Sequence, residues 1–337
     1  MTETVLVTGG SGFIGGWCVI ELLRRGYTVR TTVRSLGKAP AVRAAIAAEV
    51  DPGDRLTFHA AELTSAAGWD EAVAGCDFVL HVASPLGTGA TRNDDELVIP
   101  AREGTLHVLR AASKAGVRRV VLTSSVAAIG GIGTEEVRDE TSWTDLDAPD
   151  VHAYRRSKTV AERAAWDFVA ADPGGMELAT VLPSIVIGPV LSPDNLGSVQ
   201  VISRLVGGKL PGMPRLGFTM TDVRDVADLH LRAMTMPEAA GERFIAATSF
   251  KWMREIAAIL RQRLGARAAK VPTRNLPDWL VRLMALFDPA IRYVTPSLGR
   301  SNSWSSAKAQ RVLGWQPRPI EDSIADCAES LIDKGAV

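Results

Sequence analysis

Short runs rich in β-branched residues alternate with helix-like segments through the first half of the chain. The expected strands are 4–8, 27–33, 55–60, 77–83, 118–125 and 177–184, and the expected helices are 12–25, about 40–49, 65–74, roughly 95–115 and 151–171. This alternation predicts βαβ units with right-handed crossovers and a parallel sheet. Several runs are apolar at nearly every position, as expected when helices cover both sheet faces. The sequence therefore predicts an α/β, doubly wound parallel-sheet fold.

The pattern changes after about residue 184, where Gly- and Pro-rich stretches surround helical segments. Helical spacing is found at 197–206, 222–235, 250–264, 276–287, 305–313 and 319–333. With few strand signals, this part is predicted to be a smaller, mostly helical lobe. We expect a first domain over 1–183, completed by roughly 219–247, and a substrate-binding lobe made of 184–218 and 248–337.

Composition narrows the classes of function. The 38 basic and 38 acidic residues balance, which disfavours a nucleic-acid partner. Cys18, Cys76 and Cys327 are far apart, with no CxxC or Cys/His cluster, so neither a disulfide framework nor a metal site is expected. The N-terminus runs straight into a strand, leaving no room for a signal peptide, and the most apolar late stretch (276–294) is too charged to span a bilayer. We expect a cytoplasmic protein with no membrane partner.

A glycine-rich turn joins the first strand to the first helix in VTGGSGFIGGWCVIELLRRG. Two registers fit, Gly9-x-x-Gly12-x-x-Gly15 and Gly10-x-Gly12-x-x-Gly15. Small residues there let the backbone approach a pyrophosphate at the positive end of the helix. The alternative is a tight turn without a ligand, but the strand–turn–helix context favours a dinucleotide and a Rossmann fold.

The end of the second strand discriminates between cofactors. NAD-binding units carry an acidic residue there for the ribose 2′-hydroxyl. This chain instead has Arg34, with Lys38 close behind and no acid. A guanidinium suits a 2′-phosphate, although an exposed arginine ending a strand is the alternative. NADP(H) is favoured over NAD(H).

Tyr154 and Lys158 lie four residues apart in a predicted helix, so both project from one face. Free tyrosine has a pKa of about 10, and a nearby ammonium favours its phenolate. The pair suits proton transfer to or from a carbonyl or alcohol; taken alone, it also fits a solvated surface. Thr123, Ser124 and Ser125 end the preceding strand, where ligands bind in such sheets, and a hydroxyl there could bond the substrate oxygen.

The segments TGGSGFIG, HVASP, TSS and YRRSKTVAE, in this order and spacing, resemble the motifs of the extended short-chain dehydrogenase/reductases. GYTVRTTVR, HVASP and LPSIVIGP narrow the resemblance to the branch of dihydroflavonol 4-reductases, cinnamoyl-CoA reductases and related microbial carbonyl reductases. It extends to SSAKAQRVLGW near the C-terminus. The resemblance implies reduction of an aldehyde or ketone.

The same resemblance implies roles for individual residues. Ser125 would orient the carbonyl, Tyr154 would donate its proton, and Lys158 would hold the nicotinamide ribose and lower the tyrosine's pKa. Other implied cofactor contacts are Gly9, Ser11, Gly12, Phe13 and Ile14 at the pyrophosphate, Glu62 and Leu63 beside the adenine, Val82, Ala83 and Ser84 at the ribose, Thr123 at the strand end, Pro183, Ile185 and Val186 at the nicotinamide, and Ser198 at a phosphate.

Two positions depart from the family pattern. Glu62 stands where the family has Asp, and its extra methylene puts the adenine contact in doubt. Five residues past Ser125, plant flavonoid reductases carry a polar residue that contacts substrate, and Gly130 stands there in this chain. This departure weakens a flavonoid assignment.

These features predict an NADPH-dependent carbonyl reductase acting on a hydrophobic or aromatic small molecule, as a monomer or homodimer. The aromatic and Met residues at 276–293 have helical spacing and are expected in the core or in a pocket wall. An NAD-dependent sugar-nucleotide epimerase or dehydratase of the same fold is the enzymatic alternative, which Arg34 disfavours. A dinucleotide-sensing protein is the non-enzymatic one, and the intact Ser125, Tyr154 and Lys158 set disfavours it.

Overall fold

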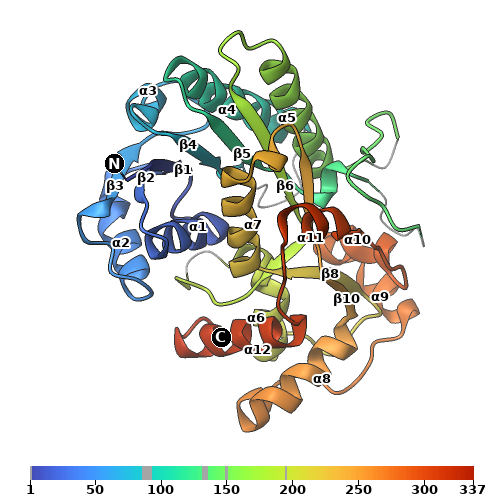
Figure 1. Cartoon of the computed structure of the whole chain (residues 1–337). Helices are drawn as coiled ribbons and strands as arrows, with labels where there is room; N and C mark the ends of the chain where they lie inside the picture. The colour runs from blue at the N-terminus through green and yellow to red at the C-terminus, as the bar shows by residue number, and fades with distance from the viewer. Residues whose placement is uncertain (1, 86–92, 131–135, 149–150, 194–195) are drawn as a thin grey trace.

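A parallel sheet of seven strands forms the centre of the chain, counted over residues 2–85, 93–130, 136–148, 151–193 and 196–337, which this computed structural model describes. The strand order is β3-β2-β1-β4-β5-β6-β9 (Figure 1). The strands are β1 (Thr4–Val7), β2 (Thr28–Val33), β3 (Leu56–Ala60), β4 (Phe78–His81), β5 (Arg119–Thr123), β6 (Glu177–Pro183) and β9 (Arg243–Ala246). The order reverses between β1 and β4, so the sheet is doubly wound, as the sequence predicts.

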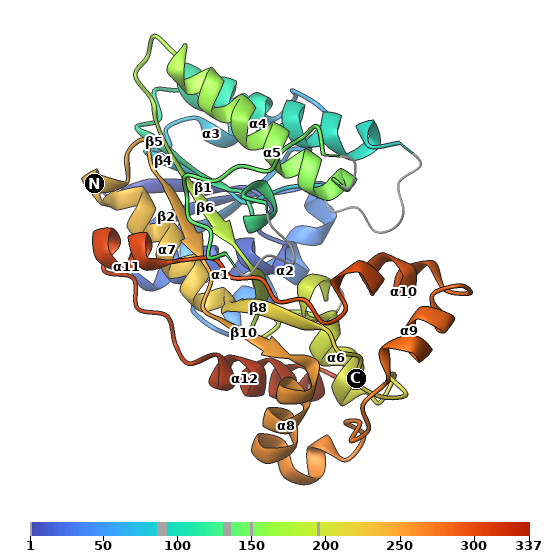
Figure 2. The same cartoon turned by 90° about the vertical axis from the view of Figure 1, so that its right-hand side faces the viewer.

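Helices cover both faces of this sheet (Figure 2). One layer consists of α1 (Phe13–Arg24), α2 (Ala39–Ala47), α7 (Val223–Thr235) and α11 (Ala307–Leu313), and the other of α3 (Trp69–Val73), α4 (Asp95–Lys114) and α5 (Ala153–Ala170). Successive side chains of β1 point to opposite faces of the sheet, so this strand contributes to both cores. Val5 and Val7 belong to the core under α1 and α7, and Leu6 belongs to the core under α4. Two covered faces explain why the strands are apolar at successive positions.

A second, smaller sheet was not predicted. Its order is β10-β8-β7, from β7 (Ile185–Ile187), β8 (Gly217–Asp222) and β10 (Ser249–Trp252). The helix predicted at 250–264 begins later, as α8 (Met253–Leu264), because its first residues form β10. The other helices of this lobe are α6 (Gln200–Val206), α9 (Asp278–Met284), α10 (Pro289–Val294) and α12 (Ile320–Asp333).

Ser184 is the single residue between β6 of the large sheet and β7 of the small one. The backbone N–H of Ser184 donates to the Ala246 carbonyl at 3.0 Å, at the end of β9, which leads into β10. The small sheet therefore starts at the carboxyl ends of β6 and β9. Within 219–247, α7 and β9 join the large unit whereas β8 lies in the small sheet; the division into domains remains a prediction.

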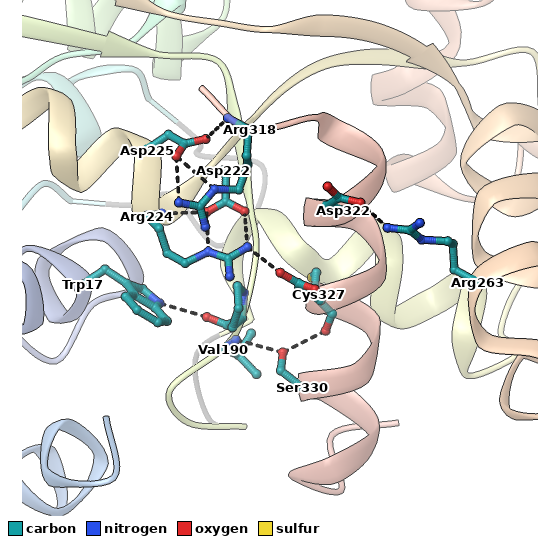
Figure 3. A network of polar contacts seen from close by, with 12 residues as sticks. Trp17, Val190, Asp222, Arg224, Asp225, Arg263, Arg318, Asp322, Cys327 and Ser330 are labelled. Carbon is teal, nitrogen blue, oxygen red and sulfur yellow. Dashed lines mark hydrogen bonds and ion pairs between the residues drawn. The ribbon is translucent and has the colours of Figure 1, made fainter. Parts of the chain in front are cut away.

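Ion pairs between two buried aspartates, Asp222 and Asp225, and partly exposed arginines join α12 to the start of α7 (Figure 3). Arg224 donates to Asp222 at 2.7 Å and to Asp326 of α12 at 2.6 Å. Arg318, just before α12, donates through its backbone N–H and its Nε to the carboxylate of Asp225, at 2.9 and 3.0 Å. These contacts fix the C-terminal helix against the large unit.

No helix in the described ranges is long and apolar enough to cross a bilayer. Cys18, Cys76 and Cys327 are buried, free thiols, and burial raises the pKa of each. Among the described residues, no group of His, Cys, Asp and Glu is arranged to hold a metal.

Candidate active site

The glycine turn after β1 is held tightly in place. Gly9 has φ of +72°, which favours glycine, and its carbonyl accepts the N–H of Gly12 at 2.8 Å. A Cβ on Gly15 would lie 2.3 Å from the Gly9 carbonyl oxygen, so only glycine lets α1 approach the turn this closely. Gly9, Ser11, Gly12, Phe13 and Ile14 thus gather at the carboxyl end of β1 and the first turn of α1.

The start of α1 suits a dinucleotide phosphate. Gly12 is its N-cap and makes no side-chain cap, and the first turn carries no acidic residue. The first N–H groups of this 12-residue helix therefore have no side-chain acceptor, and the helix dipole favours an anion there.

Arg34 and Lys38 lie at the end of β2, both exposed, Lys38 in the 3₁₀ turn Leu36–Lys38. Neither forms an ion pair with a carboxylate of the described chain. Both cations are thus available to an outside anion beside the glycine turn. A 2′-phosphate fits these donors better than a ribose hydroxyl does.

The predicted adenine and ribose contacts lie after β3 and β4. The carboxylate of Glu62 already accepts the Thr64 hydroxyl in its own turn, while Leu63 packs against Gly104 of α4. Val82, Ala83 and Ser84 are half-buried, and the N–H groups of Val82 and Ala83 donate to the Thr8 hydroxyl at 3.0 and 2.9 Å.

His81 is buried at the end of β4, and its Nδ1 lies 2.9 Å from Thr8 Oγ1. Since that oxygen accepts two backbone N–H groups, its own hydrogen is donated to Nδ1, which leaves the imidazole hydrogen on Nε2. Burial, with a smaller contribution from Lys158, lowers the pKa of His81 to about 3. His81 is therefore a neutral residue that packs against the glycine turn.

Thr123 is the last residue of β5, Ser124 and Ser125 follow it directly, and all three are buried. Thr123 Oγ1 contacts Nε2 of His230 on α7 at 2.7 Å, and Ser124 Oγ donates to Glu162 at 2.5 Å. Ser125 caps the 3₁₀ turn Val126–Ala128, accepting the Ala127 N–H at 3.1 Å, and contacts the Pro183 carbonyl at 3.5 Å. All three hydroxyls thus have partners, and the contacts of Ser125 are longer than those of Thr123 and Ser124.

Tyr154 and Lys158 lie one turn apart near the start of α5. Lys158 is buried, and its Nζ donates to the Thr123 carbonyl at 3.3 Å, which joins α5 to the end of β5. Burial lowers the pKa of Lys158 to about 8, opposed by the charge of Glu162. An ammonium with this pKa can change its charge near neutrality.

Pro183 ends β6, and Ile185 and Val186 belong to β7, on the side of the site where the small sheet begins. Ser198, in the 3₁₀ turn Gly197–Val199, donates its hydroxyl to the Val186 carbonyl. The predicted residues thus lie at or shortly after the carboxyl ends of β1 to β6, with Ile185, Val186 and Ser198 beyond them in β7 and the turn that contacts it. Their individual roles remain predictions.

Gly130 is buried with φ of +96°. A Cβ at this position would lie 3.1 Å from Arg138 Nη1 and 3.4 Å from Thr144 Cα. A polar side chain at 130 would therefore meet both backbone strain and the Arg138 guanidinium. The local backbone conformation and the neighbouring Arg138 therefore explain why glycine occupies position 130.

The sequence interpretation missed a buried ion pair behind the site. Glu162 and Arg243 are 2.8 Å apart, with side-chain exposures of 0% and 9%. The i+4 spacing of Glu162 from Lys158 was a visible signal, but Arg243 is 81 residues away in sequence. Only the fold brings it to this place.

The family model for the NAD dependent epimerase/dehydratase family matches residues 5–247. The chain belongs to this family, the extended short-chain dehydrogenase/reductases. It is 34% identical over 339 residues to a cinnamoyl-CoA reductase of Medicago truncatula, covering 98% of this chain and 96% of the relative. It is 35% identical over 274 residues to a maize (Zea mays) dihydroflavonol 4-reductase, covering 77% and 74%.

Among solved structures, the chain resembles yeast methylglyoxal/isovaleraldehyde reductase complexed with NADPH. The TM-score is 0.80 and the identity 25%, over 99% of this chain and all of that one. Together with the family, these reductases identify the chain as an NAD(P)H-dependent oxidoreductase with a Rossmann fold.

Proposed function

We propose that this protein is an NADPH-dependent reductase that converts an aldehyde or ketone to an alcohol, reversibly. The observation that supports the proposal is the hydrogen bond from the buried Lys158 Nζ to the Thr123 carbonyl, which joins α5, the helix that carries Tyr154, to the end of β5, two residues before Ser125. When bound, a nicotinamide cofactor supplies the hydride.

The chain's own residues then handle the proton. Ser125 donates a hydrogen bond that orients the substrate carbonyl, and Tyr154 passes its phenolic proton to the developing alkoxide. Lys158, held charged against burial, stabilises the resulting phenolate because an ammonium nearby lowers a tyrosine pKa. Tyr154 and Lys158 are aligned by α5, which packs along α4 over the sheet.

The choice of NADPH is supported by Arg34 and Lys38, two exposed cations at the end of β2. The NADPH named with the yeast reductase agrees with that choice. Retention of NAD by an epimerase or dehydratase is the alternative within this family, and an arginine at the position of the usual ribose-binding acid disfavours it.

For the substrate we propose a hydrophobic or aromatic carbonyl compound. On α9 and the turn after it, Trp279 is 66% exposed and Phe287 is 83% exposed, an apolar surface on the proposed substrate lobe. Glycine at 130, with Arg138 beside it, favours substrates other than dihydroflavonols.

Replacing Tyr154 with Phe tests the mechanism. We expect carbonyl-dependent NADPH oxidation to fall by roughly 100- to 10,000-fold, the contribution of a general acid. NADPH binding, followed by fluorescence, should change little because the aromatic ring at position 154 remains.

The substrate for this assay comes from a screen of aromatic aldehydes, aliphatic ketones, β-keto esters and hydroxycinnamoyl thioesters. A Tyr154→Phe protein that retains full activity would rule out the mechanism, and NAD that co-purifies tightly would favour the epimerase alternative.

A further inference from the structure

The carboxylate of Glu162 lies at the centre of a buried network directly behind the proposed site. It is on α5, one turn beyond Lys158, and fully buried. Its donors are Ser124 Oγ at 2.5 Å, Arg243 Nε at 2.8 Å, Thr180 Oγ1 at 3.0 Å and Trp166 Nε1 at 3.4 Å. Both carboxylate oxygens therefore accept hydrogen bonds, from the residue after β5, from β6 and β9, and from α5 itself.

Arg243 anchors this carboxylate from β9. Its Nη1 donates to the carbonyls of Glu140 and, at 3.0 Å, Ser142, and its guanidinium lies 3.7 Å from the centre of the Trp143 ring. The arginine is thus fixed on several sides. A fixed arginine in turn fixes the position of the Glu162 charge.

The network reaches the site by two routes. The first is Ser124, the neighbour of Ser125: its short bond to Glu162 ties the end of β5 to α5. Replacing the carboxylate would leave the buried Ser124 hydroxyl without that charged acceptor.

The second route is electrostatic. Lys158 and Glu162 line one small cavity of about 10 Å³, together with Ser84, Thr123 and Ser124. Both side chains are buried, so solvent screens their attraction only weakly. Arg243 is absent from the described residues that line this cavity. Of these two charges, the carboxylate is the one that raises the pKa of Lys158 against the effect of burial.

Few other titratable groups act on Lys158. Tyr154 shares its helix face. His81 on β4 interacts with it electrostatically, and His230 on α7 reaches it only through Thr123. Burial lowers the pKa of His81 to about 3 and that of His230 to about 4, so both are neutral above pH 6. Glu162 is thus the anionic group near Lys158 in the described part of the chain.

We propose that Glu162 is a positioning residue of the reductase site: held by Arg243, it fixes the end of β5 through Ser124 and keeps the ammonium of Lys158 charged. The inference rests on the proposed function of Lys158. It adds that the negative charge of Glu162 is what keeps Lys158 protonated. Without Glu162, burial alone would act on the lysine, and its pKa would fall further.

The test is a direct titration of Lys158 in the cofactor-free protein. Lysine labelled with ¹³C at its ε-carbon is followed by NMR against pH, and the Lys158 signal is assigned by its loss in Lys158→Arg. We expect the pKa of Lys158 to fall by about one unit in Glu162→Gln, the size of one nearby opposite charge. An unchanged Lys158 pKa would overturn the proposal.

Glu177→Gln is the matched control. Glu177 also pairs with a buried arginine, Arg119, at 2.6 Å, but it begins β6 at the end of the sheet away from the site. The Glu177→Gln substitution should lower stability without changing the pKa of Lys158.

Should Glu162→Gln fail to fold because Arg243 is left unpaired, the double variant Glu162→Gln/Arg243→Gln removes both charges. Its Lys158 pKa should still lie below that of the wild type.

Turnover provides the second measurement. In Glu162→Gln, the fall of kcat on the alkaline side should move to lower pH by the same one unit, because Lys158 loses its proton earlier. If Glu162 had only a structural role, Glu162→Gln would lower stability and the alkaline fall of kcat would stay at the same pH. The NMR titration needs no turnover, so a wild-type protein inactive on every carbonyl would refute the proposed function alone.

Discussion

At the scale of single residues, Arg34 is the position on which the choice of cofactor depends. We expect Arg34→Gln to lower kcat/KM with NADPH by 10-fold or more, because a charge-assisted hydrogen bond to phosphate is worth about 1.5–3 kcal/mol. The efficiency with NADH should change little. Parallel assays with both cofactors measure this.

Arg30→Gln is the control for that substitution. Arg30 lies within β2, the strand that Arg34 follows, and its substitution removes the same charge, but its guanidinium donates to the Glu71 carbonyl at 3.3 Å. It should leave the cofactor preference unchanged. Equal efficiency of the wild type with NADH and NADPH would defeat the phosphate assignment.

Single residues also mark how far sequence reasoning reaches. Tyr154 and Lys158 could be predicted because both lie on one helix and their spacing fixes their common face. The place of Ser125 at the carboxyl edge of the sheet could be predicted because the carboxyl ends of parallel strands meet at one edge. Arg243 could not, since its contact with Glu162 depends on how β9 and α5 pack. Local spacing carries no information on such a contact.

At the scale of elements, Gly15 decides whether α1 can lie against the turn after β1. A Cβ on Gly15 would lie 2.3 Å from the carbonyl oxygen of Gly9. A backbone oxygen cannot rotate away from such a contact as a side chain can. We expect Gly15→Ala to cost about 1–3 kcal/mol of unfolding free energy, as overpacking does, and to weaken NADPH binding. Urea denaturation and fluorescence titration measure the two effects.

Gly174→Ala is the matched control for that element. Gly174 lies in the exposed turn after α5, and its Cβ would come no closer than 3.4 Å to Asp172. Neither stability nor cofactor binding should suffer. Normal NADPH affinity in Gly15→Ala would show that the turn tolerates a shift of α1.

The small sheet shows why elements of the substrate lobe were harder to predict than those of the large sheet. β7 has only three residues, too few for a period of two to stand out, and β10 runs directly into α8. The pairing partners of β8 are its neighbours only in space. In the large sheet, by contrast, a helix separates each of β1 to β5 from the next strand in the chain.

At the scale of the whole molecule, Arg318 holds α12 and the large unit together through Asp225 (Figure 3). Arg318→Met should lower the unfolding free energy by about 1–3 kcal/mol, because the buried Asp225 carboxylate loses its side-chain partner and keeps only the backbone N–H of residue 318. Arg254→Met, an exposed arginine of α8, should change it by less than about 0.5 kcal/mol.

The pH dependence of that loss distinguishes a charge effect from lost packing. Burial raises the pKa of Asp225 above its usual value, and Arg318 opposes this rise. Without Arg318 the folded-state pKa rises further, so between the unfolded and folded pKa values the folded chain binds more protons than the unfolded one. Stability in that window falls as pH rises. The deficit of Arg318→Met against the wild type should therefore shrink on acidification from pH 7 to 5, as measured by urea denaturation. A deficit that stays constant with pH would mean that the arginine contributes by packing alone.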